Sequence, residues 1–164
     1  MEPDIIELPR TLVVGVPTFG EPTGGQFMAL WDILGEVMDT VADRAVPVRY
    51  YGVQSYTDAF QATGQWFYLA GVEVTSLDEV PVQAAAKIVP AGTYAVFTYT
   101  GPLPGTLPEL FQYAYQQWLP QSGYAAAGPY DLERYDERFL GPASADSVME
   151  ICIPIVPANG GGPA

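Results

Sequence analysis

Apolar positions along the chain follow two periods, and their order predicts alternating strands and helices. Residues 12–16 are apolar apart from one glycine, so we expect a buried strand there, ended by Pro17. Residues 27–41 predict a helix, because their apolar side chains recur at spacings of three and four. Strands are then expected at 47–53 and 65–74, which are rich in aromatic and β-branched residues.

The same order of elements begins again after residues 76–90, which look like a connection without a regular element of its own. Residues 93–100 predict a strand and residues 106–118 a helix. Two strands, at 125–135 and 148–155, complete the second set. The chain therefore reads as two βαββ halves.

The second predicted helix has a recognisable start and end. Thr106 and Glu109 fit a capping box, with Pro108 in the first turn, and Pro120 would end the helix. Aligning the halves on their strands places Tyr51 in the first half at the position that Glu133 occupies in the second.

This order predicts an α+β fold in which the two βαββ halves are related by a pseudo-two-fold axis. We expect antiparallel sheets covered by the two helices, with a ligand cleft at the seam between the halves. Residues 1–157 would form a single domain, and residues 158–164, which are rich in glycine, a flexible tail.

Composition narrows the cellular setting. No basic start followed by an apolar stretch marks a signal peptide, and no apolar run is long enough to span a membrane. Cys152 is the one cysteine, so an internal disulfide is excluded. We expect a cytoplasmic protein.

The charge balance is strongly acidic. Six Lys and Arg face nineteen Asp and Glu, which gives a formal net charge of −13. Such a field repels phosphate backbones, so direct nucleic-acid binding is not expected, and it attracts cationic small molecules. The simpler interpretation is that the acidity serves solubility alone.

Several chemistries are excluded by absent residues. The chain has no histidine, so it has no histidine-based triad, general base or metal ligand. Neither a Walker loop nor a dinucleotide-binding glycine motif occurs, and we expect no cofactor and no metal site. Carboxylates, tyrosines, tryptophans and the backbone remain as the groups available for function.

Four segments resemble a known family. They are residues 88–102 (IVPAGTYAVFTYTGP), 117–124 (QWLPQSGY), 132–139 (LERYDERF) and 149–155 (MEICIPI), in the right order. Together they are similar to the GyrI-like proteins, which are also the effector-binding domains attached to many AraC- and MerR-type regulators. Because nothing before residue 5 could be a helix-turn-helix, the resemblance implies a standalone member without a DNA-binding part.

The resemblance implies a function in binding bulky, lipophilic and often cationic aromatic molecules, for sensing or for sequestration of drugs and toxins. It leaves two further functions open. One branch of the family hydrolyses cyclopropane-bearing genotoxins, and other members protect DNA gyrase from inhibitors. The last function would require a protein partner, and homodimer formation is also left open.

Glu133 is the first candidate for the binding site. The resemblance implies that this acid lies at the pocket floor and meets the cation of the ligand. A carboxylate in an aromatic cavity pays a desolvation cost that a cationic ligand would recover, and its pKa should be raised without ligand. The alternative is a solvated acid in the charged run of Asp131, Glu133, Asp136 and Glu137.

Four aromatic residues complete the predicted site. Tyr51 should face Glu133 from the other half, with a core tyrosine as the alternative. Trp118 lies on the apolar stripe of the second helix and could be a core residue or a pocket wall. Trp66 and Tyr68 share one face of their strand and could form walls as well.

Binding and catalysis would use the same two groups. If the chain is a hydrolase, Glu133 would serve as general base for water and the Tyr51 hydroxyl would assist the electrophile. The sequence does not separate this alternative from binding alone.

Overall fold

The computed structural model describes residues 2–21 and 25–158, and within them it forms one curled antiparallel sheet. The path through the sheet is β1-β6-β9-β8-β3-β4-β2-β5, and β7 pairs with the far end of β9. The strands are β1 (Asp4–Leu8), β2 (Thr11–Gly20), β3 (Tyr50–Tyr56), β4 (Trp66–Val74), β5 (Ala85–Val89), β6 (Gly92–Thr100), β7 (Tyr124–Ala126), β8 (Tyr130–Tyr135) and β9 (Val148–Pro157).

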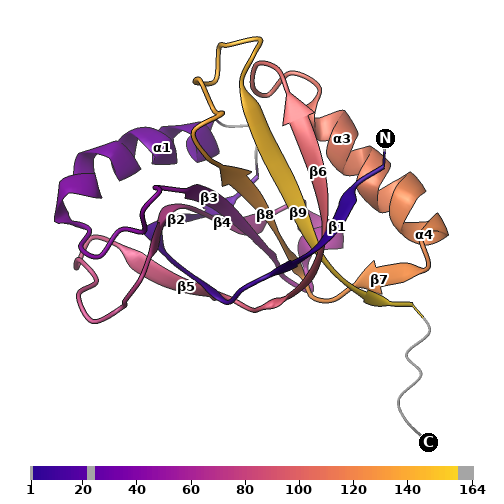
Figure 1. Cartoon of the computed structure of the whole chain (residues 1–164), viewed down its shortest axis with the longest axis horizontal. Coiled ribbons are helices and arrows are strands. Elements are labelled where there is room, and N and C mark those ends of the chain that lie inside the picture. The colour runs from indigo at the N-terminus through magenta and orange to yellow at the C-terminus, as the bar shows by residue number, and fades with distance from the viewer. Residues whose placement is uncertain (1, 22–24, 159–164) are drawn as a thin grey trace, which may run out of the picture.

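The helices lie on one face of this sheet, one over each half (Figure 1). Helix α1 (Gln26–Val37) continues into the 3₁₀ turn η2 (Met38–Thr40) and packs through Leu30 and Leu34 against β2 and β4. Helix α3 (Leu107–Tyr113) continues through the π-helical turn η3 (Ala114–Trp118) into α4 (Leu119–Gln121).

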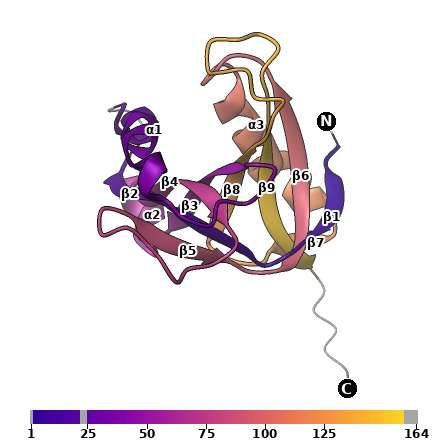
Figure 2. The same ribbon diagram turned by 60° about the vertical axis from the view of Figure 1, so that its left-hand side comes forward.

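The helix of the second half packs on β6 and β9, where Phe97 and Ile151 belong to its core cluster. A short helix, α2 (Phe60–Thr63), joins β3 to β4. Figure 2 shows the two halves from a second direction, with helix α1 over one and helix α3 over the other. No helix in the described residues is long and apolar enough to cross a membrane.

The predicted duplication is confirmed, and it extends to strands that the sequence pattern did not indicate. β1 begins at Asp4 and β5 at Ala85, and β2 begins at Thr11 and β6 at Gly92, so both pairs of equivalent strands are 81 residues apart. β1 pairs with β6, and β5 pairs with β2. Each half therefore gives its first short strand to the edge of the other half.

The pseudo-two-fold axis passes between the central strands β3 and β8. An interval of 81 residues relates Gly52 to Glu133, and these two residues are also directly paired in the β3–β8 ladder. The predicted equivalence of Tyr51 and Glu133 is therefore wrong by one residue. Because side chains alternate between the faces of a strand, this single step moves Tyr51 to the opposite face of the sheet.

Three element boundaries differ from the sequence prediction because of proline. Strand β2 continues through Pro17 to Gly20, since its partner β5 pairs only as far as Gly15 and the proline needs no donor on that side. The second helix continues past Pro120, which lies in the first turn of α4, where a proline is tolerated. The predicted strand 125–135 is two strands, β7 and β8, interrupted before Tyr130 around Pro129.

The predicted helix start is confirmed only in part. Helix α3 begins after Thr106 and has Pro108 in its first turn. The side chain of Thr106, however, makes no capping hydrogen bond, so the predicted capping box is wrong. The region 76–90, predicted as a plain connection, contains β5. The predicted tail, apart from Ala158, lies outside the described residues.

Candidate functional site

Strand β8 directs a row of polar side chains onto the face of the sheet that the helices cover. Alternation along the strand places Asp131, Glu133 and Tyr135 on this face. In the adjoining ladder Asp131 lies opposite Gln54, and Gln54 lies opposite Tyr68. Residues directly opposite each other in antiparallel strands share a face, so these side chains meet where the two halves join.

Glu133 is buried and fully engaged by neutral donors. The residue is only 9% exposed. The Tyr68 hydroxyl donates to Oε2 over 2.6 Å, and the Tyr135 hydroxyl donates to the same atom over 3.0 Å. The Gln54 amide Nε2 donates to Oε1 over 3.2 Å. No ion pair of the described residues includes this carboxylate.

Gly52 makes the contact between Tyr68 and Glu133 possible. A Cβ atom at Gly52 would overlap both Oε2 of Glu133 and the hydroxyl of Tyr68. The hydroxyl therefore reaches the carboxylate through space that any other residue at this position would fill.

The environment of Glu133 favours its neutral form. Burial raises the pKa of this carboxyl group, and the hydrogen bonds from Tyr68 and Tyr135 oppose the rise. A bound cation would act in the same direction as these hydrogen bonds, because an opposite charge nearby favours the ionised carboxylate.

Asp131 is a second buried carboxylate two residues earlier on the same strand. It is completely buried, and its Oδ2 accepts hydrogen bonds from Tyr56 over 2.8 Å and from Tyr115 over 2.9 Å. Burial raises the pKa of Asp131 to about 7, against the lowering effect of these two hydroxyls, and Glu133 adds to the rise. The site therefore contains two acids whose charges are disfavoured in the same small volume.

Aromatic rings from helix α1 pack on the tyrosines that hold Glu133. Phe27 stacks on Tyr68, with ring centroids 4.8 Å apart and planes at 10°, and also meets the edge of Trp66 at 5.1 Å. Trp31 meets Tyr135 edge to face at 5.1 Å. Flat rings thus already occupy the space next to the carboxylate.

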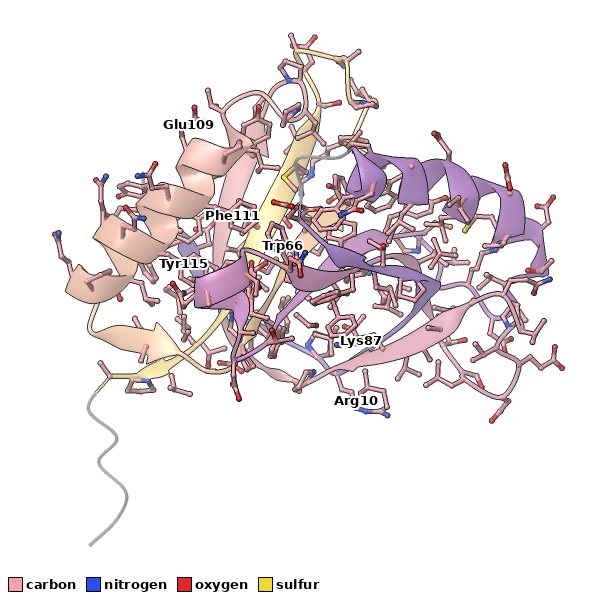
Figure 3. The ribbon with its side chains drawn as sticks, turned by 180° about the vertical axis from the view of Figure 1, so that it is seen from behind. Arg10, Trp66, Lys87, Glu109, Phe111 and Tyr115 are labelled. Atoms are coloured by element: carbon pink, nitrogen blue, oxygen red, sulfur yellow. The ribbon has the colours of Figure 1, made fainter. Side chains whose placement is uncertain are left out.

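A second group of rings lies toward Asp131. Tyr56 packs on Phe60 at 4.7 Å, and Phe60 meets Trp66 edge to face at 5.7 Å. Figure 3 shows Trp66 between the helices of the two halves, with Phe111 and Tyr115 on the side of helix α3. The two acids therefore lie on the floor of an aromatic layer to which both halves contribute.

The structure brings three of the five predicted site residues to this place. Glu133 and Tyr68 are in direct contact, and Trp66 lies beside the ring of Phe27 that covers Tyr68. The alternative interpretation of a solvated charged run is wrong for Asp131 and Glu133, because both are buried. It holds for Glu137, which is exposed.

Trp118 belongs to the core of the second half. It meets Phe97 edge to face at 5.4 Å and stacks near Tyr124 at 6.4 Å, and its indole N–H donates to Glu2 over 3.3 Å. Phe97 is on β6, two strands away from Glu133 on β8. Of the two roles left open by the sequence, packing in the core is the one that the geometry supports.

Tyr51 lies on the opposite face of the sheet from Glu133. Its direct partner on β8 is Arg134, and its hydroxyl donates to Glu73 over 3.2 Å. It lines a pocket of about 350 Å³, with Arg49 and Arg134. The pair of Glu133 and Tyr51 that the hydrolase alternative requires is therefore not assembled.

Two pockets of the described residues lie mainly on the face of the sheet opposite Glu133. The second pocket, of about 240 Å³, is lined by Val53, Ser55 and Tyr130, which share a face with Tyr51. It is also lined by Tyr56, whose hydroxyl donates to Asp131. On the face of Glu133, the seam predicted as a ligand cleft is lined by rings such as Phe27, Trp31 and Trp66, which are partly buried.

Four residues of the candidate site escaped the sequence prediction: Gln54, Tyr56, Asp131 and Tyr135. One signal could have identified Asp131 and Tyr135, since both are two residues from Glu133 on a strand and must share its face. Gln54 and Tyr56 depend on the register between β3 and β8, which the sequence alone did not give.

Comparison with known proteins agrees with this fold. Residues 1–156 match the model of the GyrI-like small molecule binding domain. The transcriptional regulator BrlR of Pseudomonas aeruginosa is 35% identical over 155 residues, which cover 94% of this chain and 56% of that regulator. The chain therefore spans little more than half the length of this relative.

Two solved structures share the fold at low sequence identity. The structure of SAV2435 bound to tetraphenylphosphonium has a TM-score of 0.75 and 15% identity, over 95% of this chain and 94% of that one. The EcmrR C-terminal domain has a TM-score of 0.74 and 17% identity, over 94% and 96%. The match to the family model over nearly the whole chain shows that the protein belongs to the GyrI-like small-molecule-binding domains.

Proposed function

We propose that this protein binds bulky lipophilic cations, aromatic ones above all, with the cationic centre next to Glu133 and the rings between helices α1 and α3. The observation that carries the proposal is the environment of Glu133. A buried carboxylate held by uncharged donors, without a cation of its own, is stabilised by a ligand that brings one.

The surroundings favour a cation with a flat apolar body. Phe27, Trp31 and Trp66 are each partly buried, so a ring inserted among them would be covered on more than one side. Contacts of a cation with aromatic faces contribute roughly 0.5–2 kcal/mol each. The net charge of −13 attracts such ligands over a longer range.

The stack of Phe27 on Tyr68 suggests how a ligand enters. Phe27 lies in the first turn of helix α1 and is partly exposed. A ligand ring that replaced the Phe27 ring would rest on Tyr68, whose hydroxyl contacts Glu133. In support, SAV2435, a protein with a similar fold, has been solved bound to tetraphenylphosphonium, an aromatic cation of this class.

Titration with tetraphenylphosphonium, followed by tryptophan fluorescence, tests the proposal because Trp31 and Trp66 lie in the aromatic layer. Glu133→Gln keeps the shape and an acceptor for the tyrosines but removes the charge. We expect binding at least tenfold weaker than wild type. Glu79→Gln removes an equal charge at an exposed position and serves as the matched control.

A neutral ligand of related shape, triphenylphosphine oxide, separates charge from shape. It should bind weakly and with equal affinity to wild type and Glu133→Gln. Tetraphenylphosphonium binding that is the same in wild type and in Glu133→Gln would overturn the proposal.

A further inference from the structure

Two buried polar atoms of the described residues have no hydrogen-bond partner, and both are at the Asp131 end of the site. They are Oδ1 of Asp131 and the indole Nε1 of Trp66. Buried polar atoms in folded proteins are almost always paired, because an unpaired one loses its hydration without replacement. An unpaired carboxylate oxygen next to the proposed ligand site is therefore available to accept a hydrogen bond from a ligand.

The position of the free oxygen follows from how Asp131 is held. Tyr56 and Tyr115, from the two different halves, both bind Oδ2. This fixes the carboxyl group from two sides and leaves Oδ1 as the oxygen with unused lone pairs. The side chain is completely buried, so bulk water does not take up that capacity.

Asp131 and Glu133 point to the same side at a fixed spacing. Two residues along a strand are separated by roughly 6.5–7 Å, and residues at this interval share a face. A molecule with its cationic centre at Glu133 can therefore reach Oδ1 of Asp131 with a group about 7 Å away from that centre. Tyr68, which binds Glu133, is in the same cross-strand row as Gln54 and Asp131. The space between the two acids is therefore part of the proposed ligand site.

We infer that Asp131 is a second recognition position, which makes the site selective for aromatic cations that carry an N–H donor at the edge of their ring system. The inference rests on the proposed function, since it assumes a cation at Glu133, and it narrows the ligand class. Donor-free cations bind through Glu133 and the rings alone. Cations with an amino group gain a hydrogen bond from that group to Oδ1.

A pair of matched ligands tests the selectivity. Ethidium is a permanent aromatic cation with two amino groups at its ring edges, and its desamino analogue has the same charge and ring system without them. A hydrogen bond to a buried carboxylate corresponds to roughly a tenfold change in affinity. We expect wild-type protein to bind ethidium roughly tenfold more tightly than the analogue.

The variant Asp131→Asn replaces the unpaired acceptor Oδ1 with a hydrogen-bond donor. The tyrosine hydroxyls can donate only to the amide oxygen, so this oxygen should take the place of Oδ2 and the amide N–H₂ group the place of Oδ1. The preference for ethidium should then disappear, while binding of the desamino analogue stays within about twofold of wild type. Asp78→Asn, at an exposed position, makes the same charge change and should keep the preference.

The outcomes separate this inference from the proposed function. If neither ligand binds wild type, or if Glu133→Gln leaves both affinities unchanged, the proposed function fails. If both ligands bind through Glu133 but wild type does not discriminate between them, the inference about Asp131 is overturned. Equal weakening of both ligands by Asp131→Asn overturns it too.

One further measurement needs no variant. An ethidium derivative with fully methylated amino groups keeps the ring and charge but has no N–H. Wild type should bind this derivative as weakly as the desamino analogue; binding as tight as that of ethidium contradicts the inference.

Discussion

Gly52 lies directly opposite Glu133 in the central ladder, and the same two residues are equivalents in the duplicated halves. The missing side chain of one provides the space in which the carboxylate of the other meets the Tyr68 hydroxyl. The two halves thus contribute different residues to the site on the axis: the first half contributes the glycine and the second half the acid.

Gly52→Ala should damage this site directly. The new methyl group overlaps Oε2 of Glu133 and the Tyr68 hydroxyl, so the hydrogen bond between them must break or the strands must shift. We expect a loss of roughly 1–3 kcal/mol in the free energy of unfolding and loss of tetraphenylphosphonium binding. Urea denaturation and fluorescence titration measure the two effects.

Gly35→Ala is the matched control. Gly35 lies in helix α1, and a Cβ atom there meets nothing within 4 Å. Alanine in an exposed helix interior should stabilise the protein by up to about 1 kcal/mol and leave binding unchanged. Equal behaviour of the two variants would contradict the role given to Gly52.

Tyr68→Phe should shift the pH dependence of cation binding. The Tyr68 hydroxyl lowers the pKa of Glu133 against the effect of burial, so its removal raises that pKa further. Because the neutral acid no longer attracts a cation, affinity is lost as the pH falls through the pKa of Glu133. The loss should begin at higher pH in the variant, which titrations with tetraphenylphosphonium between pH 5 and pH 8.5 would detect. An unshifted profile would speak against the contact.

Tyr51→Phe should leave cation binding as it is in wild type. Tyr51 faces away from Glu133, and the substitution removes only its hydrogen bond to Glu73. Loss of that bond should cost about 1 kcal/mol of stability. A tenfold loss of tetraphenylphosphonium affinity in this variant would show that the ligand uses the other face of the sheet.

Asp131 should make the protein less stable as the pH rises from about 4 to about 7. Its pKa in the folded protein is about 7 against an ordinary 3.8, so the folded state binds the proton more tightly than the unfolded chain. Stability supplied by this proton is present at low pH and lost as the pH rises through 7, by roughly 4 kcal/mol in all.

Asp131→Asn isolates this contribution, since Glu133 and other acids remain in both proteins. The variant should be more stable than wild type at pH 8, and the difference should shrink toward pH 5. Urea denaturation at pH 5, 6, 7 and 8 measures it, with Asp78→Asn as the control. A constant difference across these values would mean that Asp131 does not titrate in this range.

The sequence predicted the repeat well because apolar periodicity reports which face of each element is buried. It could not predict β1 and β5. Each has five residues and owes its place to an edge strand of the other half, so little of its pattern is internal. Pro17 and Pro120 were wrongly taken as the ends of their elements. The cost of a proline depends on whether a backbone N–H donor is needed at its position, which the sequence does not show.

The sequence predicted individual residues of the site but not which of them contact each other. Glu133 was identified correctly as buried, but its partner was taken to be Tyr51 where the structure has Tyr68. The error came from an alignment of weakly similar halves, in which one residue of shift exchanges the two faces of every strand. Asp131 was missed because an acid within a charged run resembles a surface residue until its neighbours in space are known.

The position of Gly52 and Glu133 on the symmetry axis also constrains how such a protein can arise. In a dimer of identical half-length chains, the residue at this place would face its own copy. Two glutamates would then bring like charges together, and two glycines would leave no acid. A homodimer of that kind could not have held this arrangement, so the two copies had to become different before one glycine could face one acid on the axis.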